Sequence, residues 1–203
     1  MTSSTLLHTV AARRDHTAAI RIVSMLFITA LTAAAAQISI PLPFTAVPFT
    51  FQPMVVLLGG LALGSRLGAT SQILYLALGI FGLPVFAASP TLPPGALRLL
   101  GPTGGYLMSY PFAALAVGYL AERGFDRRYV TSVLAMLAGL AIVYAGGVSW
   151  LGLFARVNGA PAATGVREAF VTGVAPFVLA DVTKLLFAAA IVPGLWRLVG
   201  RAR

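Results

Sequence analysis

The sequence predicts an all-α integral membrane protein, and two observations carry that prediction. Of 203 residues, 59% are apolar and only 9% are charged, whereas a soluble domain carries about 25% charged residues. Several apolar runs also approach the ~20 residues that a helix needs to span a bilayer. A soluble protein with an unusually large core would not need such runs, so lipid is expected to solvate most of the surface.

Six membrane spans are expected in one domain. The second and third are separated at Gly64-Ser65-Arg66, because one merged helix of ~30 residues would overshoot the bilayer. We expect a cytoplasmic N-terminal tail over residues 1–19, a six-helix membrane domain over 20–196 and a basic cytoplasmic tail over 197–203. The expected spans are 20–38, 51–64, 67–83, 105–120, 130–154 and 170–195.

The arginines predict the orientation of these spans. With six spans both termini lie on one side, and that side receives ten arginines while the other side receives three. The positive-inside rule then places both termini in the cytoplasm. The ten are Arg13, Arg14, Arg21, Arg66, Arg123, Arg127, Arg128, Arg197, Arg201 and Arg203, and the three are Arg98, Arg156 and Arg167.

Charge and cysteine content exclude other classes of function. The net charge is +9, but the charges sit in short gaps between apolar runs, which is typical of topology signals and not of nucleic-acid binding. The chain has no cysteine, so disulfides and thiolate metal sites are excluded. Nucleophile-elbow, zinc-protease and phosphate-loop motifs are absent from the sequence, which argues against an enzyme.

Two segments on the predicted outer side are rich in proline. Residues 37–53 carry prolines at positions 41, 43, 48 and 53, which exclude a regular helix, yet the segment is apolar and aromatic. It is interpreted either as a lid over a pocket or as a tightly packed turn. Residues 84–102 allow the same two interpretations.

A buried charge pair is the strongest candidate for a binding site. Asp181 and Lys184 interrupt the last apolar run, and each charge costs roughly 2.5–3.5 kcal/mol at a bilayer centre. Their i,i+3 spacing places both on one helix face. They either neutralise one another or form the polar part of a ligand site, where Asp accepts N–H groups and Lys donates to oxygen.

Other motifs are weaker when taken singly. Gly101, Gly104 and Tyr106 belong to a glycine-rich run that opens the fourth span, either as a tight turn or as a ligand contact. Small residues four apart in the first span, Ala30 with Ala34 and Thr32 with Ala36, favour close helix packing, internally or against a partner subunit.

Four runs together resemble a known family. Residues 40–52, 75–87, 101–106 and 176–184 occur in the order seen in the BioY family, the biotin-specific substrate-binding (S) components of energy-coupling factor (ECF) transporters. The resemblance covers about residues 20–195. One departure is the stretch 87–96, which is proline-rich where the family has a glycine-rich loop, so ligand contacts from this loop are in doubt.

The resemblance implies biotin uptake across a bacterial cytoplasmic (inner) membrane by a multi-pass protein that is not an enzyme and binds no cofactor. Outer loops would cap the pocket, and the site is expected to include Asp181, Lys184, Gln52, Tyr75, Phe86, Arg98, Gly101, Thr103, Gly104 and Tyr106. Arg98 is the candidate for the biotin carboxylate, since arginine suits carboxylates.

The resemblance also implies partners. Ala30 and Ala34 would dock on a transmembrane coupling (T) subunit, and two ATPase (A) subunits would use ATP. Whether the chain also works alone is left open. The alternatives are an S component for thiamine or riboflavin, a membrane-embedded enzyme, and a structural membrane protein whose Asp181 and Lys184 only neutralise one another.

Overall fold

Helices make up most of the fold. The computed structural model describes residues 17–88, 94–157 and 162–201. The elements are α2 (Thr17–Gln37), β1 (Ser39–Ile40), β2 (Phe49–Thr50), α3 (Gln52–Leu63), α4 (Ser65–Ile80), α5 (Leu97–Leu100), α6 (Gly104–Leu120), the π-helical turn η1 (Ala121–Phe125), α7 (Tyr129–Val157), α8 (Ala162–Gly173), α9 (Ala175–Ala188) and α10 (Ile191–Arg201).

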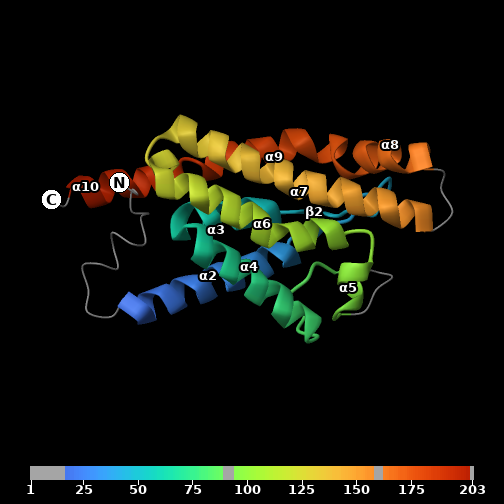
Figure 1. Ribbon diagram of the computed structural model, residues 1–203, viewed down its shortest axis with the longest axis horizontal. Coiled ribbons are helices and arrows are strands. Elements are labelled where there is room, and N and C mark those ends of the chain that lie inside the picture. The colour runs from blue at the N-terminus through green and yellow to red at the C-terminus, as the bar shows by residue number, and fades with distance from the viewer. Residues whose placement is uncertain (1–16, 89–93, 158–161, 202–203) are drawn as a thin grey trace.

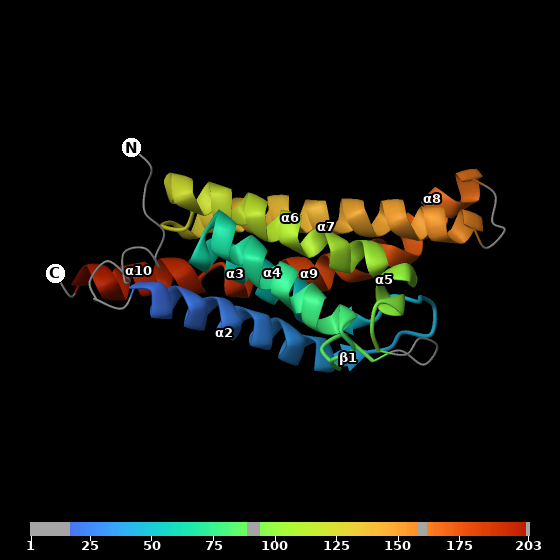
Figure 2. The ribbon, with the colours of Figure 1, turned by 60° about the horizontal axis from the view of Figure 1, so that its bottom comes forward.

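The helices form an elongated bundle with α6 at its centre. Helix α6 packs against α3, α4 and α7, and α2 lies along α3 and α4 on the opposite side of the bundle from α7 (Figure 2). The core between them is apolar, with Leu57, Val117 and Met136 almost fully buried. Small residues allow this close packing, because a side chain at Gly118 would collide with the backbone at Gly64 and Ser65.

The predicted break between the second and third spans is confirmed. Gly64 has a φ of 87°, in the left-handed region that glycine adopts without strain, and it separates α3 from α4. The Glu122 carboxylate of η1 accepts hydrogen bonds from the Ser65 backbone N–H at 2.8 Å and from the Ser65 hydroxyl at 2.7 Å. These bonds satisfy donors at the start of α4 that have no partner within the helix.

The single helix expected over residues 170–195 is wrong, because three helices occupy this region. Helix α8 ends at Gly173 and α9 begins with Pro176 in its first turn. Proline has no N–H to continue the hydrogen-bond ladder of a preceding helix. A turn at residues 189–190 then separates α9 from α10, whose first turn contains Pro193 and so starts a new helix for the same reason.

Residues 38–51, which we call the 38–51 segment, form the non-helical region that their prolines predict. Its two short strands pair antiparallel, with Ser39 opposite Thr50 and Ile40 opposite Phe49. The segment lies with α5 and α8 at one end of the bundle, and the start of α2 and the end of α10 lie at the other (Figures 1 and 2).

Within the described residues, three helical stretches are long and apolar enough to cross a membrane: Ala18–Gln37, Tyr129–Phe154 and Gly165–Leu198. The protein is therefore a mostly helical membrane protein. The predicted tail boundaries at residues 19 and 196 fall inside α2 and α10, and residues 1–16 and 202–203 of the tails lie outside the described residues.

Candidate functional site

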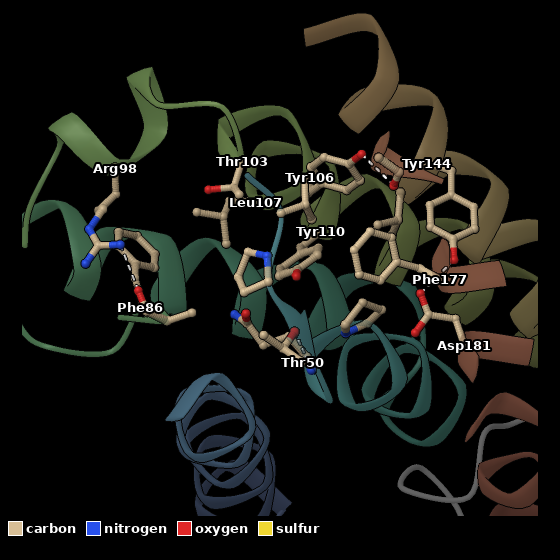
Figure 3. Close-up of a pocket in the computed structure, with 17 residues that line it drawn as sticks. Thr50, Phe86, Arg98, Thr103, Tyr106, Leu107, Tyr110, Tyr144, Phe177 and Asp181 are labelled. Atoms are coloured by element: carbon tan, nitrogen blue, oxygen red, sulfur yellow. Dashed lines mark hydrogen bonds between the residues drawn. The ribbon is translucent and has the colours of Figure 1, made fainter. Parts of the chain in front are cut away.

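An apolar cavity lies between α3, α6, α7, α9 and the 38–51 segment (Figure 3). It contains about 650 Å³ of space, including the part open to solvent. Its described lining residues are Val47, Pro48, Thr50, Gln52, Pro53, Phe86, Ala87, Arg98, Thr103, Tyr106, Leu107, Tyr110, Val143, Tyr144, Gly173, Phe177 and Asp181. Most are apolar or aromatic, so a few polar groups fix how a ligand is oriented.

Asp181 is the acidic group of this cavity, and two side chains hold its carboxylate. The Lys184 ammonium lies 2.5 Å from Oδ1, and the Tyr144 hydroxyl donates to Oδ2 at 2.7 Å. Asp181 is only 8% exposed, and a buried carboxylate needs such partners to stay charged. The remaining lone pairs of the two oxygens are suited to accept N–H groups from a ligand.

Arg98 lies on the opposite side of the cavity from Asp181 (Figure 3). It is half-buried, and its guanidinium donates to the Ala87 carbonyl at 2.8 Å. Desolvation by burial lowers the pKa of this guanidinium, which nevertheless stays protonated at neutral pH. The site therefore has an acceptor at one side and a cation at the other.

A second cavity of about 1270 Å³, including open space, adjoins the first. The two share Pro48, Ala87, Arg98 and Thr103 as lining residues. Arg98 thus lies where the cavity that contains Asp181 meets the second cavity.

Tyr75 supports the lining from behind. It is fully buried, accepts a hydrogen bond from the Gln52 amide at 2.6 Å and donates one to the Val85 carbonyl at 3.2 Å. Its ring packs edge-on against Phe86 at a centroid distance of 5.4 Å. Tyr75 therefore orients two lining residues without lining the cavity itself.

The structure brings six of the predicted site residues to the cavity wall, namely Gln52, Phe86, Arg98, Thr103, Tyr106 and Asp181. Tyr75, Lys184, Gly101 and Gly104 are not among its described lining residues. Gly101 accepts a hydrogen bond from the Trp150 indole at 2.8 Å, and a side chain at Gly104 would collide with the Leu99 carbonyl. Both glycines thus serve the close packing of α5, α6 and α7. Of the stretch 87–96, residues 89–93 lie outside the described residues.

Tyr144, Tyr110 and Phe177 also line the cavity, although sequence patterns did not predict them. Helical spacing could have found two of them, since Phe177 precedes Asp181 by four residues and Tyr110 follows Tyr106 by four. Tyr144 is a hydroxyl within an apolar span, and a buried hydroxyl needs a hydrogen-bond partner. Nothing in the sequence identified Asp181 as that partner.

The two pairs of small residues on α2 face different ways. Thr32 and Ala36 are fully buried, and the Thr32 side chain accepts a hydrogen bond from Gln72 of α4 at 3.4 Å. Ala30 and Ala34 are exposed. Internal packing therefore explains the first pair, and the second remains available on the outer face of α2.

Comparison with known proteins gives a consistent result. The BioY family model matches residues 6–201. A probable biotin transporter BioY of Pyrococcus horikoshii is 39% identical over 155 residues, covering 76% of this chain and 83% of the relative. The biotin transporter BioY of Thermotoga maritima is 39% identical over 163 residues, covering 80% and 88%.

A solved structure agrees with these relatives. The S-component for biotin from an ECF-type ABC transporter superposes with a TM-score of 0.76 at 25% identity, covering 91% of this chain and 94% of that one. Fold and relatives together define a multi-pass membrane transporter component. The chain belongs to the BioY family, a family of transporters and not of enzymes.

Proposed function

We propose that this chain captures biotin from outside the cell and acts as the S component of an ATP-driven ECF transporter. The observation that carries the proposal is the apolar cavity with an acceptor, Asp181, at one side and a cation, Arg98, at the other. Biotin presents matching groups, with the N–H groups of its cyclic urea at one end and a carboxylate at the other. The family to which the chain belongs gives the same substrate through its named relatives.

In this proposal the urea ring of biotin lies in the cavity that contains Asp181. An N–H of the ring donates to the Asp181 carboxylate, which Lys184 and Tyr144 keep charged and correctly turned. Tyr106, Tyr110 and the other apolar lining residues enclose the ring system and the aliphatic chain. The chain then leads toward Arg98, where the guanidinium pairs with the carboxylate. Thiamine, a cation, fits the Arg98 side of this site poorly.

The proposed membrane arrangement has six crossings with both termini in the cytoplasm. The described ends of the chain lie at one end of the bundle (Figure 1), which requires an even number of crossings. Helix α3 has 12 residues and is about 18 Å long, so the 38–51 segment completes its crossing. Helices α8, α9 and α10 together make the last crossing. We expect the membrane to be the bacterial cytoplasmic membrane.

Single cysteines test the orientation, because the chain has none of its own. Leu97 and Arg128 are both exposed, one at each end of the bundle. In intact cells a membrane-impermeant maleimide is expected to label Leu97→Cys and to label Arg128→Cys only after permeabilisation. Labelling in the opposite pattern would show that the protein has the opposite orientation, with both termini outside the cell.

Biotin titration into the detergent-purified chain tests the substrate and the role of Asp181. We expect near-stoichiometric binding that weakens by about 2–3 kcal/mol in Asp181→Asn, the size of a lost hydrogen bond to a charged group. Glu168→Gln, which neutralises an exposed carboxylate on α8, serves as the control and should bind like wild type. A folded wild-type protein that ignores biotin but binds thiamine or riboflavin would assign the site to that vitamin.

The methyl ester of biotin tests the role of Arg98. Wild type is expected to bind biotin more tightly than the ester by about 1.5–3 kcal/mol, because the ester removes a charged acceptor. Arg98→Gln should bind the two ligands almost equally, whereas Arg167→Gln, at an exposed arginine of α8, should keep the wild-type preference. If Arg98→Gln also kept it, the carboxylate would be recognised elsewhere.

The exposed pair Ala30 and Ala34 is proposed as the docking face for the T subunit, with A subunits supplying ATP hydrolysis. Small side chains let helices approach closely in lipid. Ala34→Leu is expected to reduce co-purification with co-expressed T and A subunits while leaving biotin affinity unchanged. Ala141→Leu, at an exposed alanine on α7, is the matched control. If both variants recovered the complex equally, the T subunit would not dock on the face that carries Ala30 and Ala34.

A further inference from the structure

The second cavity extends beyond the place where the proposed function puts the biotin carboxylate. Four of its described lining residues also line the first cavity, and Arg98 is one of them. Most of the others belong to the 38–51 segment, namely Ser39, Pro41, Leu42, Thr45 and Ala46. Biotin whose carboxylate pairs with Arg98 ends at the boundary between the cavities, so it leaves the second cavity unfilled.

The boundary between the cavities is built from residues that are bonded to one another. The Arg98 guanidinium donates to the Ala87 carbonyl at 2.8 Å, and both residues line both cavities. Figure 3 shows Arg98 on the side of the first cavity that lies away from Asp181. A ligand whose N–H groups lie on Asp181 therefore directs its other end toward this boundary. A group attached to that end would enter the second cavity.

A turn within the 38–51 segment gives the second cavity a wall with hydrogen bonds of its own. The Thr45 backbone N–H donates to the Leu42 carbonyl at 3.4 Å, and the Thr45 hydroxyl accepts from the Val47 N–H at 3.1 Å. Val47 is buried and lines the first cavity, whereas Leu42, Thr45 and Ala46 line the second. The segment thus forms part of the wall of both cavities in turn.

The lining of the second cavity indicates which chemical groups it accepts. Among its described lining residues Arg98 alone is charged, and the rest are apolar or carry a small hydroxyl. An apolar chain would be buried there favourably. An ammonium group would lose hydration without a carboxylate among these residues to replace it, and the guanidinium would repel it.

We propose that the chain also binds biotin amides, in which the carboxyl carbon of biotin is joined to an amine, with the amine part in the second cavity. The inference rests on the proposed function, since the urea ring keeps its place at Asp181. The amide carbonyl oxygen accepts a hydrogen bond from Arg98 in place of the carboxylate. Loss of the negative charge weakens this contact, and burial of an apolar amine part offsets the loss.

Two uncharged amides test whether the second cavity takes the attached group. Biotinamide has no chain on its nitrogen, and N-butylbiotinamide adds four carbons. Full burial of one CH2 group strengthens binding about fourfold. A half-buried butyl chain should therefore make N-butylbiotinamide bind the purified full chain about ten- to twentyfold more tightly than biotinamide. Equal or weaker binding of the butyl amide overturns the inference.

A charged chain of the same length shows whether the attached group lies in the cavity or in water. N-(4-aminobutyl)biotinamide ends in an ammonium group, and wild type should bind it at least tenfold more weakly than N-butylbiotinamide. Equal affinity for the two amides would mean that the chain lies in water, which contradicts the inference. This comparison needs no variant, so it holds even if a substitution in the 38–51 segment fails to fold.

A substitution that fills the second cavity tests where the chain lies. Ala46 is exposed and lines the second cavity but not the described part of the first. Ala46→Trp should reduce the affinity for N-butylbiotinamide to about that for biotinamide and leave the affinity for biotin within about twofold. Ala141→Trp, at an exposed alanine of α7, should keep the preference for the butyl amide.

The outcomes separate this inference from the proposed function. If Ala46→Trp kept the full preference for N-butylbiotinamide, the chain would not lie against the 38–51 segment and the inference would be wrong. Wild type that binds biotin but shows no preference for the butyl amide overturns the inference and leaves the proposed function standing. Wild type that binds no biotin overturns the proposed function, and the inference with it.

Discussion

Two opposite charges buried in an apolar bundle impose the constraint on which the site depends. A charge at the centre of a bilayer is costly, and removing one partner of a buried pair typically costs about 3–5 kcal/mol. Asp181 and Lys184 meet this constraint together with neutral neighbours, because Tyr144 donates to the carboxylate and the Thr50 carbonyl accepts from the ammonium. The pair thus fixes the relative positions of α7, α9 and the 38–51 segment, which form three walls of the cavity.

The same constraint explains how a proline-rich segment is accommodated in a helical membrane protein. Non-helical backbone at membrane depth needs partners for its polar groups and is tolerated where protein or a water-filled cavity surrounds it. The pairing of the two strands provides hydrogen-bond partners for part of the backbone of the 38–51 segment. The Lys184 ammonium donates a hydrogen bond to the Thr50 carbonyl. The segment also lines the second cavity, and Arg98 lies at the junction between the two cavities. In the proposed function, Asp181 and Arg98 match a ligand with N–H groups at one end and a carboxylate at the other.

Sequence patterns predicted the features that depend on local rules. The spacing of Asp181 and Lys184 predicted their pairing, and Gly64 predicted the break between α3 and α4. The division of the last span into three helices was not predicted, because hydropathy treats residues 170–195 as one apolar run. Pro176 and Pro193 nevertheless indicate where new helices begin. The hydrogen bonds from Tyr144 to Asp181 and from Lys184 to Thr50 join residues far apart in the chain, and periodicity cannot reveal such contacts. Tyr75 was predicted at the site but acts through Gln52 and Phe86, for the same reason.

In the proposed orientation of biotin, Asp181 accepts the N–H groups of the urea ring and Arg98 pairs with the carboxylate. An experimental structure of this chain with biotin bound tests both contacts at once. We predict a urea N–H within hydrogen-bond distance of the Asp181 carboxylate and the biotin carboxylate beside Arg98. A structure in which the urea ring faces Arg98 would contradict this orientation.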